Sequence, residues 1–286
     1  MKNTNSAIVF TSLAKNQAEF FNNVSCQIKQ YNISPVVISF HESSNKLFKK
    51  NGIKFYNIFE YTRKINIDNT DLEGSFRNLL QKYDIKNPYL LYGHEKAYFN
   101  IKTDKELEIK FYTYLVSLEK IFNEIKNQYK SITVFQETGG FASLMSTFYI
   151  SLHLKIPHYF VEPSFFRKRL YFIKNSFHSM RIKNNIHEQV SDEVINYLTS
   201  IKKSKKIVIP SKDKFQYQHP IHKIFRLYNL KRLSQKLFDK YILNKKEEFH
   251  YIKHHTFKHI QKVYNQVSLS SYYKKLPHKQ KFIYFR

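Results

Sequence analysis

Hydrophobic residues recur along the first two thirds of the chain in two alternating patterns. Short, almost continuous apolar runs predict buried strands at residues 7–11, 35–40, 54–58, 132–136 and 158–161. Apolar residues spaced by three or four positions predict helices at residues 16–31, 44–50, 71–83, 104–129, 141–154 and 191–201. Strands separated by helices at this spacing are typical of a parallel sheet, because parallel neighbours need crossover connections. We therefore expect residues 1–200 to form a Rossmann-like α/β domain with a mostly parallel sheet of five or more strands.

The stretch 131–175 joins a strand, a short polar loop, an apolar helix and a second strand into a β-α-β unit. Residues 137–140 (ETGG) follow the first strand, and residues 162–164 (EPS) follow the second. Polar groups thus stand at the carboxyl ends of two successive strands, which is where open α/β sheets bind their ligands. This unit makes the chain a candidate enzyme that handles a sugar or a nucleotide.

The last third of the chain is basic and is predicted to be mainly helical. A Lys-rich linker at 201–214 leads to predicted helices at 221–241 and 247–267. Residues 201–286 carry 22 of the 48 Lys and Arg but only 4 of the 22 Asp and Glu, so most of the formal net charge of +26 lies here. An asymmetry of this size indicates an anionic partner, such as lipid headgroups, a polyanionic glycan, a nucleotide-sugar phosphate or nucleic acid.

The length and composition of the chain limit the domains, disulfides and membrane segments that it can form. The chain has 286 residues, 42% of them hydrophobic, which suits one domain with a partial second domain or an appendage. Its single cysteine, Cys26, excludes an intramolecular disulfide and is predicted to lie in the core. The apolar run at 7–10 is too short for a signal-peptide core, and no stretch approaches the ~20 apolar residues of a spanning helix. We therefore expect a cytoplasmic protein.

The loop at 137–140 is the first candidate site. It lacks the Gly-x-Gly-x-x-Gly pattern and the chain has no P-loop, so we expect no NAD, FAD or other cofactor. A carboxylate in a cleft can remove the proton of an attacking sugar hydroxyl, which makes Glu137 the candidate catalytic base. Gly139 and Gly140 would let the backbone approach the substrate. In the alternative interpretation, Glu137 only complements the helix dipole and the two glycines form a structural turn.

The second candidate site follows the next strand of the unit. Pro163 holds the chain extended there, and Ser164 can cap a helix or contact a ligand. Arg167 and Arg169 suit bidentate capture of a phosphate or a sugar carboxylate. We predict that Ser164 and these two arginines bind substrate together with Glu162. The alternative interpretation is a solvated basic turn beside two core phenylalanines.

A histidine cluster near the C-terminus is the third constellation. Its members are His250, His254, His255 and His259, and pairs at helical spacing are compatible with zinc ligation. No acidic residue stands where a metalloprotease needs one, and the neighbouring lysines would repel a cation. We interpret the cluster as a basic solvent face and expect no metal site.

Two segments carry a resemblance to a known family, QETGGFAS at 136–143 and HYFVEPSFFRKRLYFIKNS at 158–176. They resemble the N-terminal half of bacterial capsular or surface polysaccharide biosynthesis proteins, which are glycosyltransferases with two Rossmann-like domains (the GT-B arrangement). The likeness covers roughly residues 6–180 and is most specific at 136–140 and 162–166. The last residues, KFIYFR at 281–286, resemble the first strand of the family's second domain.

The resemblance implies that residues 1–200 are the acceptor-side domain and that residues 201–286 are a connecting region ending in the first strand of the second domain. It implies transfer of a sugar from a nucleotide sugar to a glycan or a lipid-linked acceptor, with Glu137 as the base. An isolated chain without the donor-binding domain is expected to transfer no sugar. Further expected partners are the anionic inner face of the cytoplasmic membrane and a separate chain carrying the donor domain. The alternative function is a non-enzymatic basic module for an anionic membrane or nucleic acid, although no nucleic-acid-binding motif is present.

Overall fold

The structure is a computed structural model that describes residues 5–67, 71–99, 103–163, 170–176, 190–204, 227–248 and 252–269. Its packing divides the chain into two compact units. The first unit comprises Met1–Thr199 and Asp239–His250, and the second comprises Ser200–Phe238 and Tyr251–Arg286. A short segment from the basic last third therefore belongs to the same unit as the N-terminal elements.

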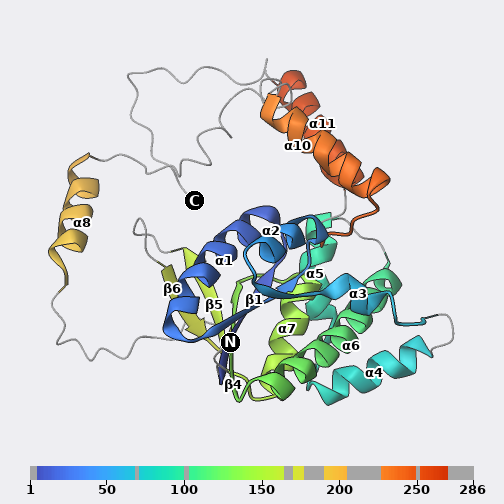
Figure 1. Cartoon of the computed structure of the whole chain (residues 1–286). Coiled ribbons are helices and arrows are strands. Elements are labelled where there is room, and N and C mark those ends of the chain that lie inside the picture. The colour runs from blue at the N-terminus through green and yellow to red at the C-terminus, as the bar shows by residue number, and fades with distance from the viewer. Residues whose placement is uncertain are drawn as a thin grey trace. The chain divides into compact units, whose positions relative to one another are not determined.

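The first unit is built on a six-stranded sheet in the order β3-β2-β1-β4-β5-β6 (Figure 1). Its strands are β1 (Ser6–Ser12), β2 (Ser34–Ser39), β3 (Lys54–Asn57), β4 (Ser131–Glu137), β5 (His158–Pro163) and β6 (Leu170–Lys174). All neighbours from β3 through β5 pair in parallel, and β6 pairs antiparallel with β5. The strand order reverses between β1 and β4, as it does in doubly wound Rossmann-like sheets. The predicted mostly parallel α/β sheet is confirmed.

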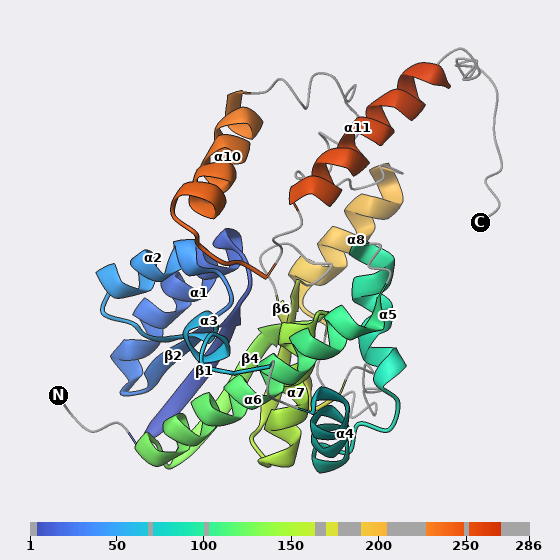
Figure 2. The same cartoon turned by 90° about the vertical axis from the view of Figure 1, so that its right-hand side faces the viewer.

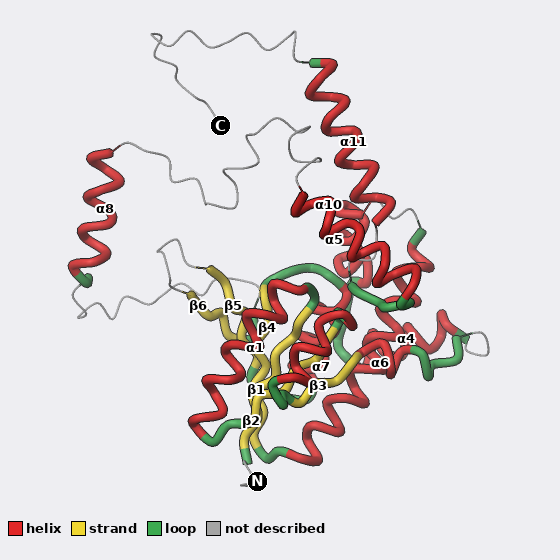
Figure 3. The backbone as a smooth tube through the Cα atoms, turned by 45° about the horizontal axis from the view of Figure 1, so that its top comes forward, coloured by secondary structure: helices red, strands yellow, loops and turns green. Residues whose placement is uncertain are grey.

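Helices connect the strands and cover both faces of the sheet. They are α1 (Lys15–Ile28), α2 (Asn45–Lys50), α3 (Ile58–Thr62), α4 (Leu72–Lys82), α5 (Pro88–Phe99), α6 (Asp104–Gln128) and α7 (Ala142–His153), followed along the chain by α8 (Asp192–Ser204). Helices α1 and α2 lie over one face, and α6 and α7 lie over the other (Figure 2). Figure 3 shows the same arrangement from another direction, with the strands between α1 and α7.

The pleat of the strands divides their apolar side chains between two cores. On β1, Val9 joins the large core under α6 and α7, whereas its neighbour Phe10 joins the smaller core under α1 and α2. On β2, Ile38 joins the large core and Val37 joins the smaller one. Because both faces are buried, these strands appear in the sequence as continuous apolar runs rather than as alternating ones. The helix predicted at 104–129 is confirmed as α6, and the apolar residues of its repeat are buried: Leu107, Phe111, Leu115, Leu118, Ile121 and Ile125.

Some elements and one residue differ from the sequence-based predictions. Helices α3 and α5 and the antiparallel strand β6 were not predicted. Cys26 is exposed, so its predicted place in the core was wrong. The side chains of α1 that are buried are Ala18, Phe21, Asn22 and Ser25. Cys26 follows Ser25 by one residue, which turns it about 100° away from the buried face.

A returning segment, residues 239–248, brings the C-terminal part of the chain back to the carboxyl end of β2. The backbone N–H of Glu248 donates to the carbonyl of Phe40 at 2.9 Å, and the N–H of Glu42 donates to the carbonyl of Lys246 at 3.0 Å. The N–H of Lys246 donates in turn to a carboxylate oxygen of Glu42 at 2.7 Å. Residues 247 and 248 were predicted to begin a helix. They lie instead beside the end of β2, where the N–H of Glu248 and the carbonyl of Lys246 find backbone partners.

The second unit contains two amphipathic helices, α10 (Leu227–Leu237) and α11 (Ile252–Ser268). They overlap the helices predicted at 221–241 and 247–267. Residues 221–226, 249–251 and 281–286 lie outside the described part of the chain, so the predictions for them stay untested. No residue of α10 is buried, and it exposes Leu227, Leu230, Leu233 and Leu237. Among the helices that the structure describes, none has the length and the apolar character that a membrane crossing requires.

The imidazole of His158, the first residue of β5, is buried and has no hydrogen-bond partner among the described residues. Its ring packs against those of Phe148 and Phe160, with centroids 5.2 and 4.6 Å away. Burial lowers the pKa of His158 to about 3. An unfolded chain takes up this proton near the ordinary pKa of ~6.5. The unfolded state therefore binds more protons between about pH 6.5 and pH 3, and stability falls as the pH drops through that range.

We expect His158→Phe to remove this loss of stability at low pH, because a phenyl ring fills the site without a titrating group. Between pH 7 and pH 5 the histidine should cost the wild type about 2 kcal/mol of unfolding free energy that the variant keeps. Urea unfolding at the two pH values measures the difference. The control is His153→Phe, at an exposed position on α7, which should keep the wild-type dependence. Equal losses in wild type and His158→Phe would show that His158 does not titrate as its burial requires.

Candidate functional site

The carboxyl ends of β1 and β4 meet where the strand order reverses. Glu137 is the last residue of β4, and its side chain is exposed. Its carboxylate accepts a hydrogen bond from the side-chain amide of Gln17, in the first turn of α1. The amide oxygen of Gln17 accepts the backbone N–H of Leu13, just beyond β1, at 2.7 Å. Gln17 thus ties Glu137 to the end of β1 and holds the carboxylate at the position where open α/β sheets bind ligands.

Glu162 lies near the end of the neighbouring strand, β5. One of its carboxylate oxygens accepts the backbone N–H of Thr138 at 2.9 Å. This bond links the loop after β4 to the end of β5, so Glu137 and Glu162 belong to one edge of the sheet. Ser164, Arg167 and Arg169 lie outside the described residues, and their substrate-binding roles stay predictions.

The two loop glycines are packed against other side chains of the protein. A Cβ at Gly139 would lie 2.8 Å from Cδ1 of Leu144, and a Cβ at Gly140 would lie 2.7 Å from Cβ of His94. Both distances are shorter than real Cβ contacts allow, so packing accounts for a glycine at 140, whereas at 139 the end of Leu144 can move aside. The structural-turn interpretation of the two glycines stays open. Their contact with a substrate stays a prediction.

We expect Gly140→Ala to destabilise the protein by about 1–3 kcal/mol, the usual cost of overpacking. The new methyl would meet Cβ of His94, which cannot rotate away because it is fixed to the backbone of α5. Gly139→Ala should cost less, because it meets only the flexible end of Leu144. The matched control is Gly93→Ala on α5, where the added methyl has no heavy atom within 4 Å and should be neutral or stabilising by up to ~1 kcal/mol. Denaturant unfolding of the three variants tests this order, and a Gly140→Ala variant as stable as wild type contradicts it.

A buried charged cluster lies directly after the glycine loop. The Glu95 carboxylate, fully buried on α5, accepts the backbone N–H of Ala142, the first residue of α7, at 2.7 Å. Lys110 on α6 donates to both Glu95 oxygens, at 2.8 and 3.1 Å, and its ammonium lies 3.2 Å from Oε1 of Glu248. Glu248, fully buried on the returning segment, accepts the hydroxyl of Tyr114 at 2.6 Å. Lys110 therefore forms ion pairs with two buried carboxylates from distant parts of the chain.

Burial has the largest influence on the pKa of Glu95. Burial raises the pKa of Glu95; the Lys110 ammonium opposes this shift, the Glu248 carboxylate adds to it, and the Ala142 N–H opposes it. The same carboxylate complements the positive end of α7, where helices commonly bind anions. The first N–H of α7 is therefore used by the protein's own Glu95. Any ligand at this edge must be bound through other groups.

Metal binding finds no support in the described part of the chain, where no three His, Cys, Asp or Glu side chains are grouped to hold an ion. Of the histidine cluster, only His259 has a described side chain, and it lies on α11. The side chains of the other three histidines are not among those that the structure describes. Their predicted place on a solvent face therefore stays a prediction.

Four polar residues of this edge were missed by the sequence analysis: Gln17, Glu95, Lys110 and Glu248. Gln17 lies only a few residues after β1, so a search for polar groups after every predicted strand would have found it. The other three lie far apart along the chain, and only tertiary contacts distinguish them from surface charges.

No protein-family model matches the chain, and a search of curated proteins finds no match either. Assignment of a function therefore rests on the site and its chemistry, because a Rossmann-like fold alone does not define one.

Proposed function

We propose that the first unit is the acceptor-side domain of a glycosyltransferase of the GT-B type that acts in capsule or surface polysaccharide biosynthesis. The observation that carries the proposal is the exposed Glu137 carboxylate at the reversal point of the sheet, oriented by Gln17. A general base must be both accessible and fixed in direction, and Glu137 meets both conditions.

The proposed chemistry is an inverting sugar transfer. Glu137 takes the proton of an acceptor hydroxyl, whose oxygen forms a bond to the anomeric carbon of the donor sugar. The bond from that carbon to the donor phosphate breaks, and the electron pair leaves with the nucleotide. The donor nucleotide is held by the second domain of this architecture, so the residues of this unit act on the acceptor.

Glu162 is the second residue of the proposed acceptor site. One of its oxygens is used by the Thr138 N–H, and this bond holds the loop that follows Glu137. Its other oxygen can accept a sugar hydroxyl. Ser164, Arg167 and Arg169 follow β5 in sequence and are the further residues proposed to bind the acceptor, because arginine suits an acidic sugar or a phosphate.

Acceptor binding tests the proposal on the chain by itself. The probes are short-chain lipid-linked mono- and disaccharides and the corresponding free sugars, titrated by calorimetry. We expect at least one probe to bind, with Glu162→Gln weakening it and Glu73→Gln, at an exposed position on α4, leaving it unchanged. Absence of binding by every probe, or equal binding by all three proteins, would overturn the proposal.

The second candidate function, a basic module for an anionic membrane, is favoured by one specific observation. Helix α10 exposes four leucines and also carries Lys231, Arg232 and Lys236. Exposed apolar and basic side chains on one helix are typical of helices that lie in a membrane interface. Binding to anionic vesicles in preference to neutral vesicles and to DNA would support this candidate, and binding to DNA alone would favour nucleic acid instead.

A further inference from the structure

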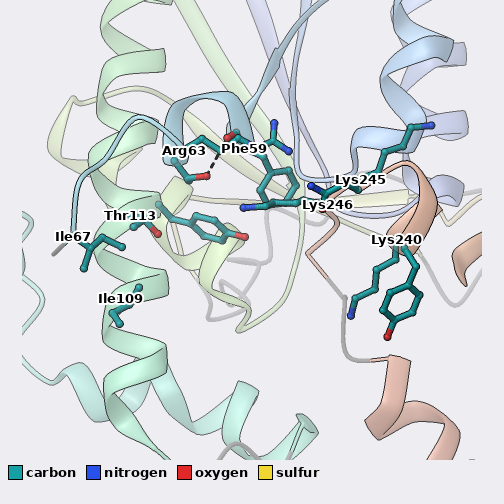
Figure 4. Close-up of a pocket in the computed structure, with 12 residues that line it drawn as sticks. Phe59, Arg63, Ile67, Ile109, Thr113, Lys240, Lys245 and Lys246 are labelled. Carbon is teal, nitrogen blue, oxygen red and sulfur yellow. Dashed lines mark hydrogen bonds between the residues drawn. The ribbon is translucent and has the colours of Figure 1, made fainter. Parts of the chain in front are cut away.

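A cavity of about 600 Å³ lies in the first unit between α3, α6 and the returning segment (Figure 4). Helix α3 contributes Phe59, Thr62 and Arg63, and α6 contributes Ile109, Thr113 and Tyr114. The returning segment contributes Lys240, Tyr241, Asn244, Lys245 and Lys246, and Ile67 completes the lining. This volume is within the range of small-molecule sites. Helix α3 directly follows β3, so the cavity opens beyond the carboxyl ends of the strands.

The wall that carries the lysines is fixed by polar bonds at several points along its length. Asp239 accepts the hydroxyl of Ser43 at 2.7 Å at one end of the returning segment. His41 lies 3.3 Å from Glu247 at the other end, next to the buried Glu248. The bonds between Glu42 and Lys246 hold the same end. The lysines therefore project from a backbone that is docked on the sheet edge.

The charge of the lining is entirely positive. Arg63, Lys240, Lys245 and Lys246 line the cavity, and none of its twelve lining residues is acidic. Arg63 and Lys245 form ion pairs with carboxylates outside the lining. Arg63 lies 3.0 Å from Glu42, and Lys245 lies 3.7 Å from Asp239. The ammonium of Lys246 has no ion-pair partner in the part of the chain that the structure describes.

The remaining lining is aromatic and apolar. Phe59, Tyr114 and Tyr241 supply rings, and Ile67 and Ile109 supply aliphatic surface. The hydroxyl of Tyr114 is already donated to Glu248, so this residue offers its ring rather than a donor. A ligand that fits this lining carries negative charge at one end and a flat, weakly polar group at the other.

We propose that this cavity binds a nucleoside phosphate. Lys246 and Lys240 contact its phosphates, and the base lies among the aromatic and aliphatic side chains. The cations donate charge-assisted hydrogen bonds to phosphate oxygens, and nucleobases commonly stack on aromatic rings such as these. The proposal uses neither Glu137 nor Glu162 and does not depend on the sugar-transfer proposal.

Calorimetric titration of the whole chain tests the proposal with uridine diphosphate, adenosine diphosphate, glucose 1-phosphate and inorganic pyrophosphate. We expect at least one nucleoside diphosphate to bind more tightly than both pyrophosphate and the sugar phosphate. Lys246→Gln should weaken that binding about tenfold, the loss expected for one charge-assisted contact. The variant keeps the backbone bonds to Glu42, so its fold should be retained.

Two further variants make the test specific to the cavity. Ile109→Trp should abolish nucleotide binding by filling the space, while circular dichroism reports whether it folds. Lys50→Gln, on the exposed surface of α2, removes the same charge elsewhere and should leave binding unchanged. Glu137→Gln should also leave it unchanged, which separates this site from the proposed acceptor site.

The outcomes that overturn the proposal are distinct. Equal weakening by Lys246→Gln and Lys50→Gln would mean that the net positive charge, and not the cavity, attracts the nucleotide. Equal affinity for pyrophosphate and the nucleotides would remove the role of the aromatic lining. No binding of any probe at millimolar concentration would show that the cavity is not an anion site.

Discussion

Glu137→Gln is expected to lower sugar transfer by about 10²–10⁴-fold, the usual loss when a general base is removed. The change is isosteric and lies at an exposed position, so it should leave the fold intact. A glutamine there can still bond to Gln17, which keeps the side chain in place while removing its ability to accept a proton. The loss should therefore appear in turnover and not in the binding of the acceptor.

The measurement compares wild type and variant with a panel of nucleotide sugars and a lipid-linked acceptor. It is run with the purified chain and, as a separate arm, with an extract of the cells that make the protein, which would supply a donor-binding chain. Glu73→Gln on α4 is the control and should transfer at the wild-type rate. Full activity of Glu137→Gln would remove Glu137 as the base, and no transfer in either arm would contradict the transferase proposal.

Lys110→Met should destabilise the protein by about 3–5 kcal/mol, the cost of leaving buried charge without its partner. Lys110 is the cation beside two fully buried carboxylates, those of Glu95 and Glu248. A methionine side chain fills similar space but carries no charge. The variant must then either bury two uncompensated carboxylates or protonate them.

Two companion variants separate this effect from a general loss of a lysine. Lys82→Met removes the ion pair with Glu119 on a partly exposed surface and should cost no more than ~1 kcal/mol. Adding Glu95→Gln to Lys110→Met should recover part of the stability, because the amide oxygen can still accept the Ala142 N–H. Denaturant unfolding compares the four proteins. A loss for Lys110→Met no larger than for Lys82→Met would show that the cluster is not held by its charges.

The sheet and the long helix α6 were predictable because their patterns are local. Strands buried on both faces give continuous apolar runs, and α6 repeats its buried residues from Leu107 to Ile125 over many turns. Glu137 was placed at the carboxyl edge for the same reason, since the end of a strand and the start of the following loop are neighbours in sequence.

Helix α5 was not predictable on these grounds. Its sequence, PYLLYGHEKAYF, has no clear apolar stripe and contains Gly93, which weakens a helix. It forms because Leu91, Tyr92 and Phe99 are buried by its tertiary contacts. The helix propensity of this stretch does not indicate such packing.

The buried charged cluster was hidden for a different reason. Its members meet only in the folded chain: Tyr114 and Glu248 are separated by 134 residues, and Glu95 and Ala142 by 47. In sequence Glu248 follows Lys245, Lys246 and Glu247 and resembles a solvated charged turn. Pairing of the returning segment with the end of β2 buries it, and no periodicity in the sequence encodes that pairing.

Hydrogen exchange with and without the lipid-linked acceptor glycan tests most directly the claim that sugars bind at the carboxyl edge beside Glu137. With the glycan bound, exchange should slow in the peptides covering residues 13–17 and 137–142, which include the Leu13 and Thr138 amides. Peptides at the amino ends of the strands, around Ser34 and His158, should be unchanged. Protection confined to those amino ends, or no change at the carboxyl edge while the glycan is bound, would contradict the account.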